Sequence, residues 1–185
     1  ARALEAALAP IERHLPDLRA ELELFAQQVI PVGWDEERHL SASYQEAIGT
    51  VYLSLHPSTL TLTEALIHEA SHNKLNALFE VDRVLENADA PLFSSPVRPD
   101  PRPLRGVLLA LHAFLPVARL YELMIDAGDP AVNASLLERY AAVRRMNRRA
   151  ADVLLPNARP TALGRGLFDE IGRWVAHYDA VGAPA

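Results

Sequence analysis

The sequence predicts a mainly helical protein of the α+β type, in which a small β element lies beside a central helix. Apolar residues recur at three- and four-residue steps over most of the chain, which is the period of an amphipathic helix. One short segment differs, because Val51, Leu53 and Leu55 alternate with Tyr52 and Ser54 as in a strand with two distinct faces. Together these two patterns predict one short strand among several helices.

The N-terminal helical pattern extends over about residues 3–29, and we expect Pro10 and Pro16 to divide it into pieces. After the predicted strand, Thr61–Glu64 has the spacing of a capping box, which satisfies free amides at a helix start. This spacing predicts a helix over about residues 62–80. Apolar residues occur on nearly every side of that helix, so we expect it to be central.

The second half of the chain reads as a stiff loop followed by three helices. Five prolines in residues 87–103 exclude regular helix or sheet hydrogen bonding, and predict an extended loop. Apolar periodicity then predicts helices over about 104–125, 131–155 and 163–180, with a turn near Pro156 before the last. The strand at residues 51–55 is also a candidate edge for pairing with an extended peptide.

Composition excludes several classes of function. The 185 residues suffice for a single domain over residues 1–185 with its own core. A net charge of -6 argues against a nucleic-acid partner, which requires clustered Lys and Arg. The lack of cysteine excludes disulfides, thiolate metal sites and a Cys nucleophile. No apolar run approaches the roughly 20 residues that span a bilayer, and no charged-then-apolar leader opens the sequence. We therefore expect a cytoplasmic protein with no membrane partner.

The sequence His68-Glu69-Ala70-Ser71-His72 is an H-E-x-x-H motif inside the predicted central helix. Residues four apart on a helix project from one face with Cβ atoms about 5–6 Å apart, close enough for both imidazoles to bind one cation. Glu69 lies about 100° around the helix, where it can reach a metal-bound water or orient a ligand. His68 and His72 are therefore the predicted metal ligands, and Glu69 the predicted catalytic group.

A metal site on this helix needs a third protein ligand. His112 is our preferred choice, because it lies on the next long helix, which can return antiparallel across the first. Glu122 on the same helix is the alternative, since a downstream helical glutamate completes the site in one class of zinc peptidases. We expect the remaining histidines to be surface residues or satisfied by hydrogen bonds; they are His14, His39, His56 and His177.

Two arginines lie on the proline-rich segment just before the His112 helix. Arg98 and Arg102 flank Asp100 in a run in which every second or third residue is proline. Guanidinium groups bind carboxylates through paired hydrogen bonds, and a stiff backbone lowers the entropy cost of holding them in place. The segment predicts an anionic co-substrate beside the metal. The alternative is that an arginine simply pairs with Asp100.

The stretch from Tyr44 to Tyr121 resembles a bacterial family known by its HEXXH-motif domain, associated with ribosomally made, post-translationally modified peptides. The segments that carry the resemblance are Glu64–Leu78, Arg98–Leu104 and Gly106–Phe114. Some members resemble Fe(II)- and 2-oxoglutarate-dependent peptide β-hydroxylases. The resemblance implies that His68 and His72 bind iron and that Arg98 and Arg102 belong to the RPDPRP-like loop. It implies a metal-binding core over about residues 44–125.

These observations leave three functional hypotheses. The leading one is an Fe(II)/2-oxoglutarate oxygenase that uses O2 to hydroxylate the β-carbon of a residue in a peptide substrate. Imidazole ligands suit iron and zinc alike, so the preference for iron rests on the arginines, which a water-activating hydrolase does not need. The runner-up is a zinc metallopeptidase in which Glu69 is the general base. The third is a non-catalytic module that binds a precursor peptide and keeps a structural metal.

Overall fold

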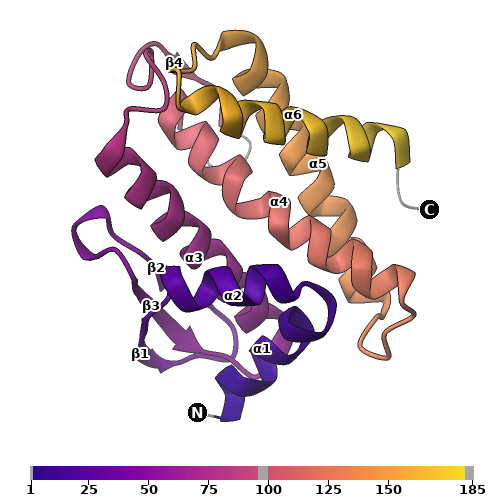
Figure 1. The fold of residues 1–185 in the computed structure, drawn as a ribbon. Coiled ribbons are helices and arrows are strands. Elements are labelled where there is room, and N and C mark those ends of the chain that lie inside the picture. Colours follow the sequence, from indigo (N-terminus) through magenta and orange to yellow (C-terminus); the bar gives the residue numbers. More distant parts are fainter. Residues whose placement is uncertain (1, 96–99, 182–185) are drawn as a thin grey trace.

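The structure is a computed structural model that describes residues 2–95 and 100–181. The predicted fold class is confirmed, since long helices dominate and one small sheet accompanies them (Figure 1). In chain order the elements are α1 (Arg2–His14), α2 (Pro16–Phe25), β1 (Gln28–Trp34), β2 (Ser41–Ala42), the 3-10 turn η1 (Gln45–Ala47), β3 (Thr50–Leu55), α3 (Thr59–Val81), β4 (Leu92–Phe93), β5 (Arg102–Pro103), α4 (Leu104–Asp126), α5 (Ala134–Asn157) and α6 (Gly164–Val181).

The N-terminal segment folds as two helices and a strand. Pro16 occupies the first turn of α2, where its missing N–H is tolerated, so the predicted break there is correct. The predicted break at Pro10 is wrong, because α1 continues through this residue. Helix was also predicted up to residue 29, but α2 ends at Phe25 and the chain enters β1 at Gln28. Pairing with β3 overrides the local helical pattern at these last residues.

The sheet has the strand order β1-β3-β2, with β1 parallel and β2 antiparallel to β3. Val51 and Leu53 in β3 are fully buried, as the alternating pattern predicted. The idea that β3 offers a free edge to a peptide is wrong. At Tyr52 and Leu53, β3 pairs with β1 on one side and with β2 on the other.

The motif-bearing helix α3 begins slightly earlier than predicted and has a different cap. Ser58 is the N-cap, and its side chain accepts a hydrogen bond from the Thr61 amide at 3.3 Å. Glu64 takes no part in a capping box, because its carboxylate binds side chains of other helices, as described below. The predicted helix over residues 62–80 is confirmed, but the capping box that suggested it is absent.

Three long helices form the body of the protein, with α3 between the sheet and α4, and α5 packed on the far side of α4 (Figure 1). Among the described helices, α4 is long and apolar enough by composition to cross a membrane, and most of that stretch is buried inside the protein. The largest fully buried side chains include Leu53, Leu62, Ile67, Leu75, Leu108, Leu111, Leu120 and Tyr121. The core therefore lies along both sides of α3.

The prediction that the prolines before α4 exclude sheet pairing is wrong, because β4 and β5 form a short antiparallel pair in this connection. The last two helices match their predictions within a few residues. Pro156 does not end the third long helix, because α5 includes it and stops at Asn157. α6 returns across α4 and α5 and closes the upper end of the bundle (Figure 1).

Candidate metal centre

The two motif histidines lie together on α3. The ring centroids of His68 and His72 are 4.3 Å apart, with an angle of 78° between the ring planes. The Phe114 ring of α4 packs against His68, with a centroid distance of 4.7 Å. A helical spacing of four residues brings the rings to one face, and α4 covers that face with an aromatic side chain.

Burial keeps both imidazoles neutral. It lowers the pKa of His68 to about 4, and the nearby positive charge of Arg139 lowers it further. Burial likewise lowers the pKa of His72 to about 4, with a smaller contribution from His68 and an opposing one from Glu69. Each ring therefore has a lone pair on one nitrogen at neutral pH.

The Nδ1 atoms of His68 and His72 are buried and have no hydrogen-bond partner among the described residues. A buried polar atom without a partner costs about 1–3 kcal/mol. Neutral imidazole is the form that binds transition metals, and a cation between the two rings would satisfy atoms that the protein leaves unpaired. On this test the two histidines fit a bound metal ion.

Glu69 points to the sheet side of α3, about a quarter turn from the histidines, and is almost fully buried. Ser41 Oγ donates a hydrogen bond to Glu69 Oε1 at 2.7 Å, and Ser43 Oγ donates to Oε2 at 2.6 Å. Both carboxylate oxygens therefore have a fixed donor from the β2 segment. This arrangement holds the carboxylate beside His72, where its charge acts on the pKa of that ring.

Neither candidate for the third ligand forms a close group with the histidine pair in the described residues. Burial lowers the pKa of His112 to about 3, and the charges of Lys74 and His72 lower it further. His112 projects from a different side of α4 than Phe114. Glu122 accepts hydrogen bonds from Arg119 at 2.7 Å and bonds His177 of α6 at 2.6 Å. Within residues 2–95 and 100–181, no three or more His, Asp or Glu side chains gather closely enough to hold an ion.

The arginines predicted to bind a co-substrate are partly described. Arg98 lies outside the described residues. Arg102 lies with Nε 3.3 Å from Asp100 Oδ2, and its side chain covers Gly106 in the first turn of α4. In the described part of the chain this Nε atom is buried and makes no hydrogen bond. Arg102 therefore has the aspartate as its neighbour, as the alternative interpretation stated.

A partly buried ion pair next to the motif was not predicted from the sequence. Arg139 of α5 donates from Nε and Nη2 to the two oxygens of Glu64, at 2.7 and 2.8 Å. Tyr121 of α4 donates its hydroxyl hydrogen to the same carboxylate at 2.5 Å. Glu64 precedes His68 by four residues, and this spacing could have predicted that the polar face of α3 extends one turn further. Nothing in the sequence could have predicted that Arg139, 75 residues away, binds Glu64.

His39 was expected to be an ordinary histidine, yet its Nε2 is buried without a partner among the described residues. It lies beside Ser54 and beside the His56 ring, with ring centroids 6.1 Å apart. Burial and His56 lower the pKa of His39, while the charges of Glu69 and Glu64 oppose the change. Its electrostatic neighbours place it near the polar face of α3.

Comparison with models of known protein families finds no match, and comparison with curated proteins finds no similar sequence. The function is therefore inferred from the motif and the residues around it.

Proposed function

We propose that this protein is an Fe(II)/2-oxoglutarate-dependent oxygenase that hydroxylates the β-carbon of a residue in a ribosomally made peptide. The observation that carries the proposal is the pair of neutral, half-buried imidazoles of His68 and His72, whose buried Nδ1 atoms have no partner in the described structure. When bound, Fe(II) would activate O2 while 2-oxoglutarate supplies two electrons, so that one oxygen atom enters the peptide, the other enters succinate, and CO2 is released.

In this proposal each residue has a limited task. His68 and His72 present lone pairs without losing a proton, because their pKa values lie near 4. Phe114 shields the rings on the α4 side. Glu69 stays fixed by Ser41 and Ser43, so we assign it an orienting role beside the metal and not that of a general base.

Arg102 is the described residue that we propose for the carboxylate of 2-oxoglutarate. Its partner Asp100 is well exposed, and exposed ion pairs contribute only about 0–1 kcal/mol. A co-substrate carboxylate can therefore replace Asp100 at little cost and also satisfy the buried Nε atom. Arg98 remains the second candidate by sequence position.

The test is anaerobic loading with Fe(II), followed by addition of O2, 2-oxoglutarate and a candidate precursor peptide. We expect succinate that depends on O2, and a peptide mass increased by one oxygen atom. Arg102→Gln should raise the KM for 2-oxoglutarate with little effect on peptide binding. Arg105→Gln, which alters a neighbouring arginine that binds Gln45 and stacks on Phe79, is the matched control.

The zinc metallopeptidase predicts a different set of results. Glu69→Gln would abolish cleavage of the peptide, and 2-oxoglutarate would have no effect on the wild-type protein. In the oxygenase, Glu69→Gln should retain succinate formation, because serine hydroxyls can also accept hydrogen bonds from an amide. A cut peptide without succinate would overturn our proposal in favour of the peptidase. Metal and peptide binding with neither product would favour the binding module.

A further inference from the structure

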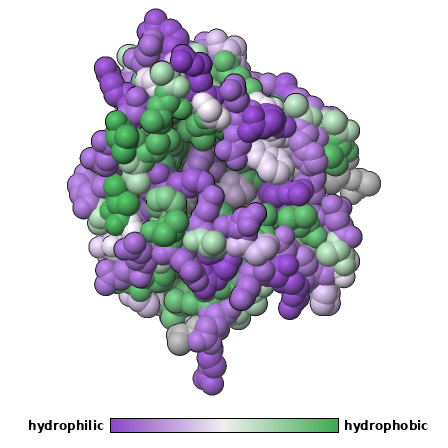
Figure 2. Space-filling view, viewed as in Figure 1, coloured by the Kyte–Doolittle hydropathy of each residue, from purple (hydrophilic) through white to green (hydrophobic). Residues whose placement is uncertain are grey.

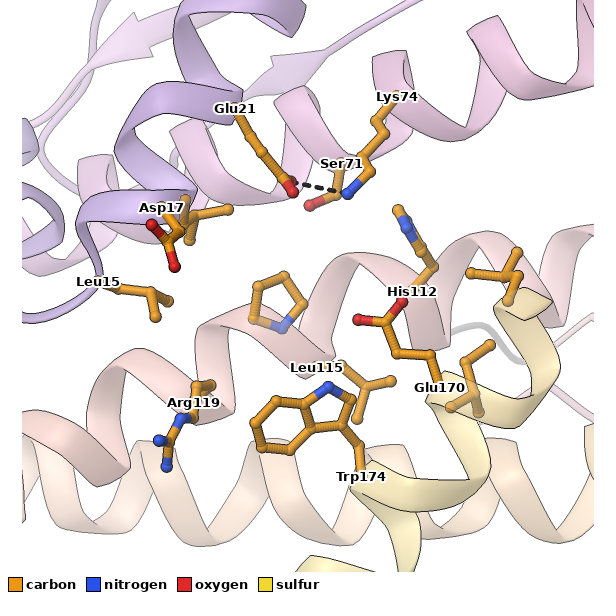
Figure 3. A pocket seen from close by; sticks show the side chains of 14 residues that line it. Leu15, Asp17, Glu21, Ser71, Lys74, His112, Leu115, Arg119, Glu170 and Trp174 are labelled. Carbon is orange, nitrogen blue, oxygen red and sulfur yellow. Dashed lines mark hydrogen bonds and ion pairs between the residues drawn. The ribbon is translucent and has the colours of Figure 1, made fainter.

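A pocket open to solvent lies on the opposite flank of α3 from Glu69. It has a volume of about 340 Å³ and is formed by α2, α3, α4 and α6 (Figure 3). That is the lower end of the size range of ligand pockets, about 300–1,000 Å³, and suits a side chain better than a large cofactor. The space-filling view shows this face hollowed near its centre, with hydrophilic and hydrophobic surface side by side (Figure 2).

The pocket carries unbalanced negative charge. Its two cationic residues already have carboxylate partners, because Lys74 binds Glu21 at 2.8 Å and Arg119 binds Glu122 at 2.7 Å. Asp17 of α2 and Glu170 of α6 also line the pocket, and in the described part of the chain neither has an ion pair or hydrogen bond. Figure 3 shows these two carboxylates on either side of the opening.

His112 of α4 also lines the pocket. Its Nδ1 atom has no hydrogen-bond partner among the residues described, but this atom is shielded from solvent and therefore lies out of reach of a ligand in the opening. The polar groups that a ligand can reach are the two carboxylates.

We propose that this pocket binds the side chain of an arginine carried by a peptide. A guanidinium has five N–H donors and no acceptor, which matches the two free carboxylates of Asp17 and Glu170. Leu115, Pro116 and Trp174 supply apolar surface for the methylene stem. The inference rests on the proposed function in one respect, because it takes that peptide to be the substrate of the oxygenase. The pocket would then anchor the substrate away from the histidine pair.

The test uses Nα-acetyl-L-arginine amide as the probe and the metal-free full-length chain. Binding is followed on the indole N–H signals in a proton–nitrogen NMR spectrum, where Trp34→Phe identifies the Trp174 signal. We expect Trp174 to shift with saturation, and the citrulline analogue, equal in shape but uncharged, to leave it unchanged. Asp17→Asn combined with Glu170→Gln should weaken binding about tenfold, and Glu46→Gln, an exposed carboxylate on η1, should not.

The outcomes distinguish a peptide ligand from a free small molecule. They also test this site independently of the proposed oxygenase activity. Tighter binding of acetyl-Gly-Arg-Gly-amide than of n-butylguanidine supports a peptide, and the reverse order would overturn that part of the proposal. Equal binding of arginine and citrulline probes, or unchanged affinity in the double variant, would overturn the site itself. Because the assay needs neither metal nor turnover, its failure is independent of whether the protein forms succinate.

Discussion

The partly buried ion pair between Glu64 and Arg139 gives a quantitative test of how strongly α5 is held against the motif helix. Arg139→Leu removes two hydrogen bonds of 2.7 and 2.8 Å and leaves the carboxylate with Tyr121 alone. Breaking a fully buried pair costs about 3–5 kcal/mol. Arg139 is 41% exposed while Glu64 is 15% exposed, so water partly replaces the arginine and we expect a loss of about 2–3 kcal/mol.

The measurement is a double-mutant cycle with Arg139→Leu, Glu64→Gln and the combined variant, followed by urea unfolding of the metal-free protein. We expect a coupling free energy of about 1–2 kcal/mol. Arg145→Leu, on the same helix, is the matched control and should change stability by less than about 0.5 kcal/mol. A coupling free energy near zero would show that the pair does not hold α5 against α3, and would refute the reasoning.

Two further predictions concern regions away from the histidines. An added Cβ at Gly164 would lie 2.1 Å from a backbone carbonyl oxygen, so Gly164→Ala should lower the melting temperature. Gly166 has open space around it, so the control Gly166→Ala should be neutral or stabilising by about 0.5–1 kcal/mol. The Ala131 amide and His14 hold the pKa of Asp129 below its usual value, so the stability it contributes is present above about pH 4 and lost in stronger acid. Asp129→Asn should therefore be less stable at pH 7, and its deficit should shrink as the pH falls; a constant deficit would contradict this.

Helices and the histidine pair were predictable because both depend on local spacing. The period of apolar residues located α4, α5 and α6 within a few residues, and a spacing of four placed His68 and His72 on one face. The parallel strand β1 was missed because its pairing with β3 joins segments that are about twenty residues apart, and its own sequence includes Pro31 and Gly33.

The surroundings of the pair were not predictable in the same way. Whether His112 turns toward His72 or toward Ser71 depends on the rotation of α4 against α3, which no local pattern encodes. In the structure Lys74, His72 and the Ser71 carbonyl all act on the His112 ring, but no group of three metal-binding side chains forms among the described residues. Arg139 reaches Glu64 from another helix, and the serines that hold Glu69 come from a segment with no regular pattern. Tertiary packing decides each of these contacts.

The central claim is that His68 and His72 bind one ion together, and metal stoichiometry of the purified chain after anaerobic Fe(II) loading tests it most directly. We expect one Fe(II) per wild-type chain, and the same for His177→Gln, which alters a half-exposed histidine on α6. His68→Gln and His72→Gln should each bind almost none while remaining folded by circular dichroism. If the double variant His68→Gln/His72→Gln retains one Fe(II) with wild-type affinity, the claim is contradicted.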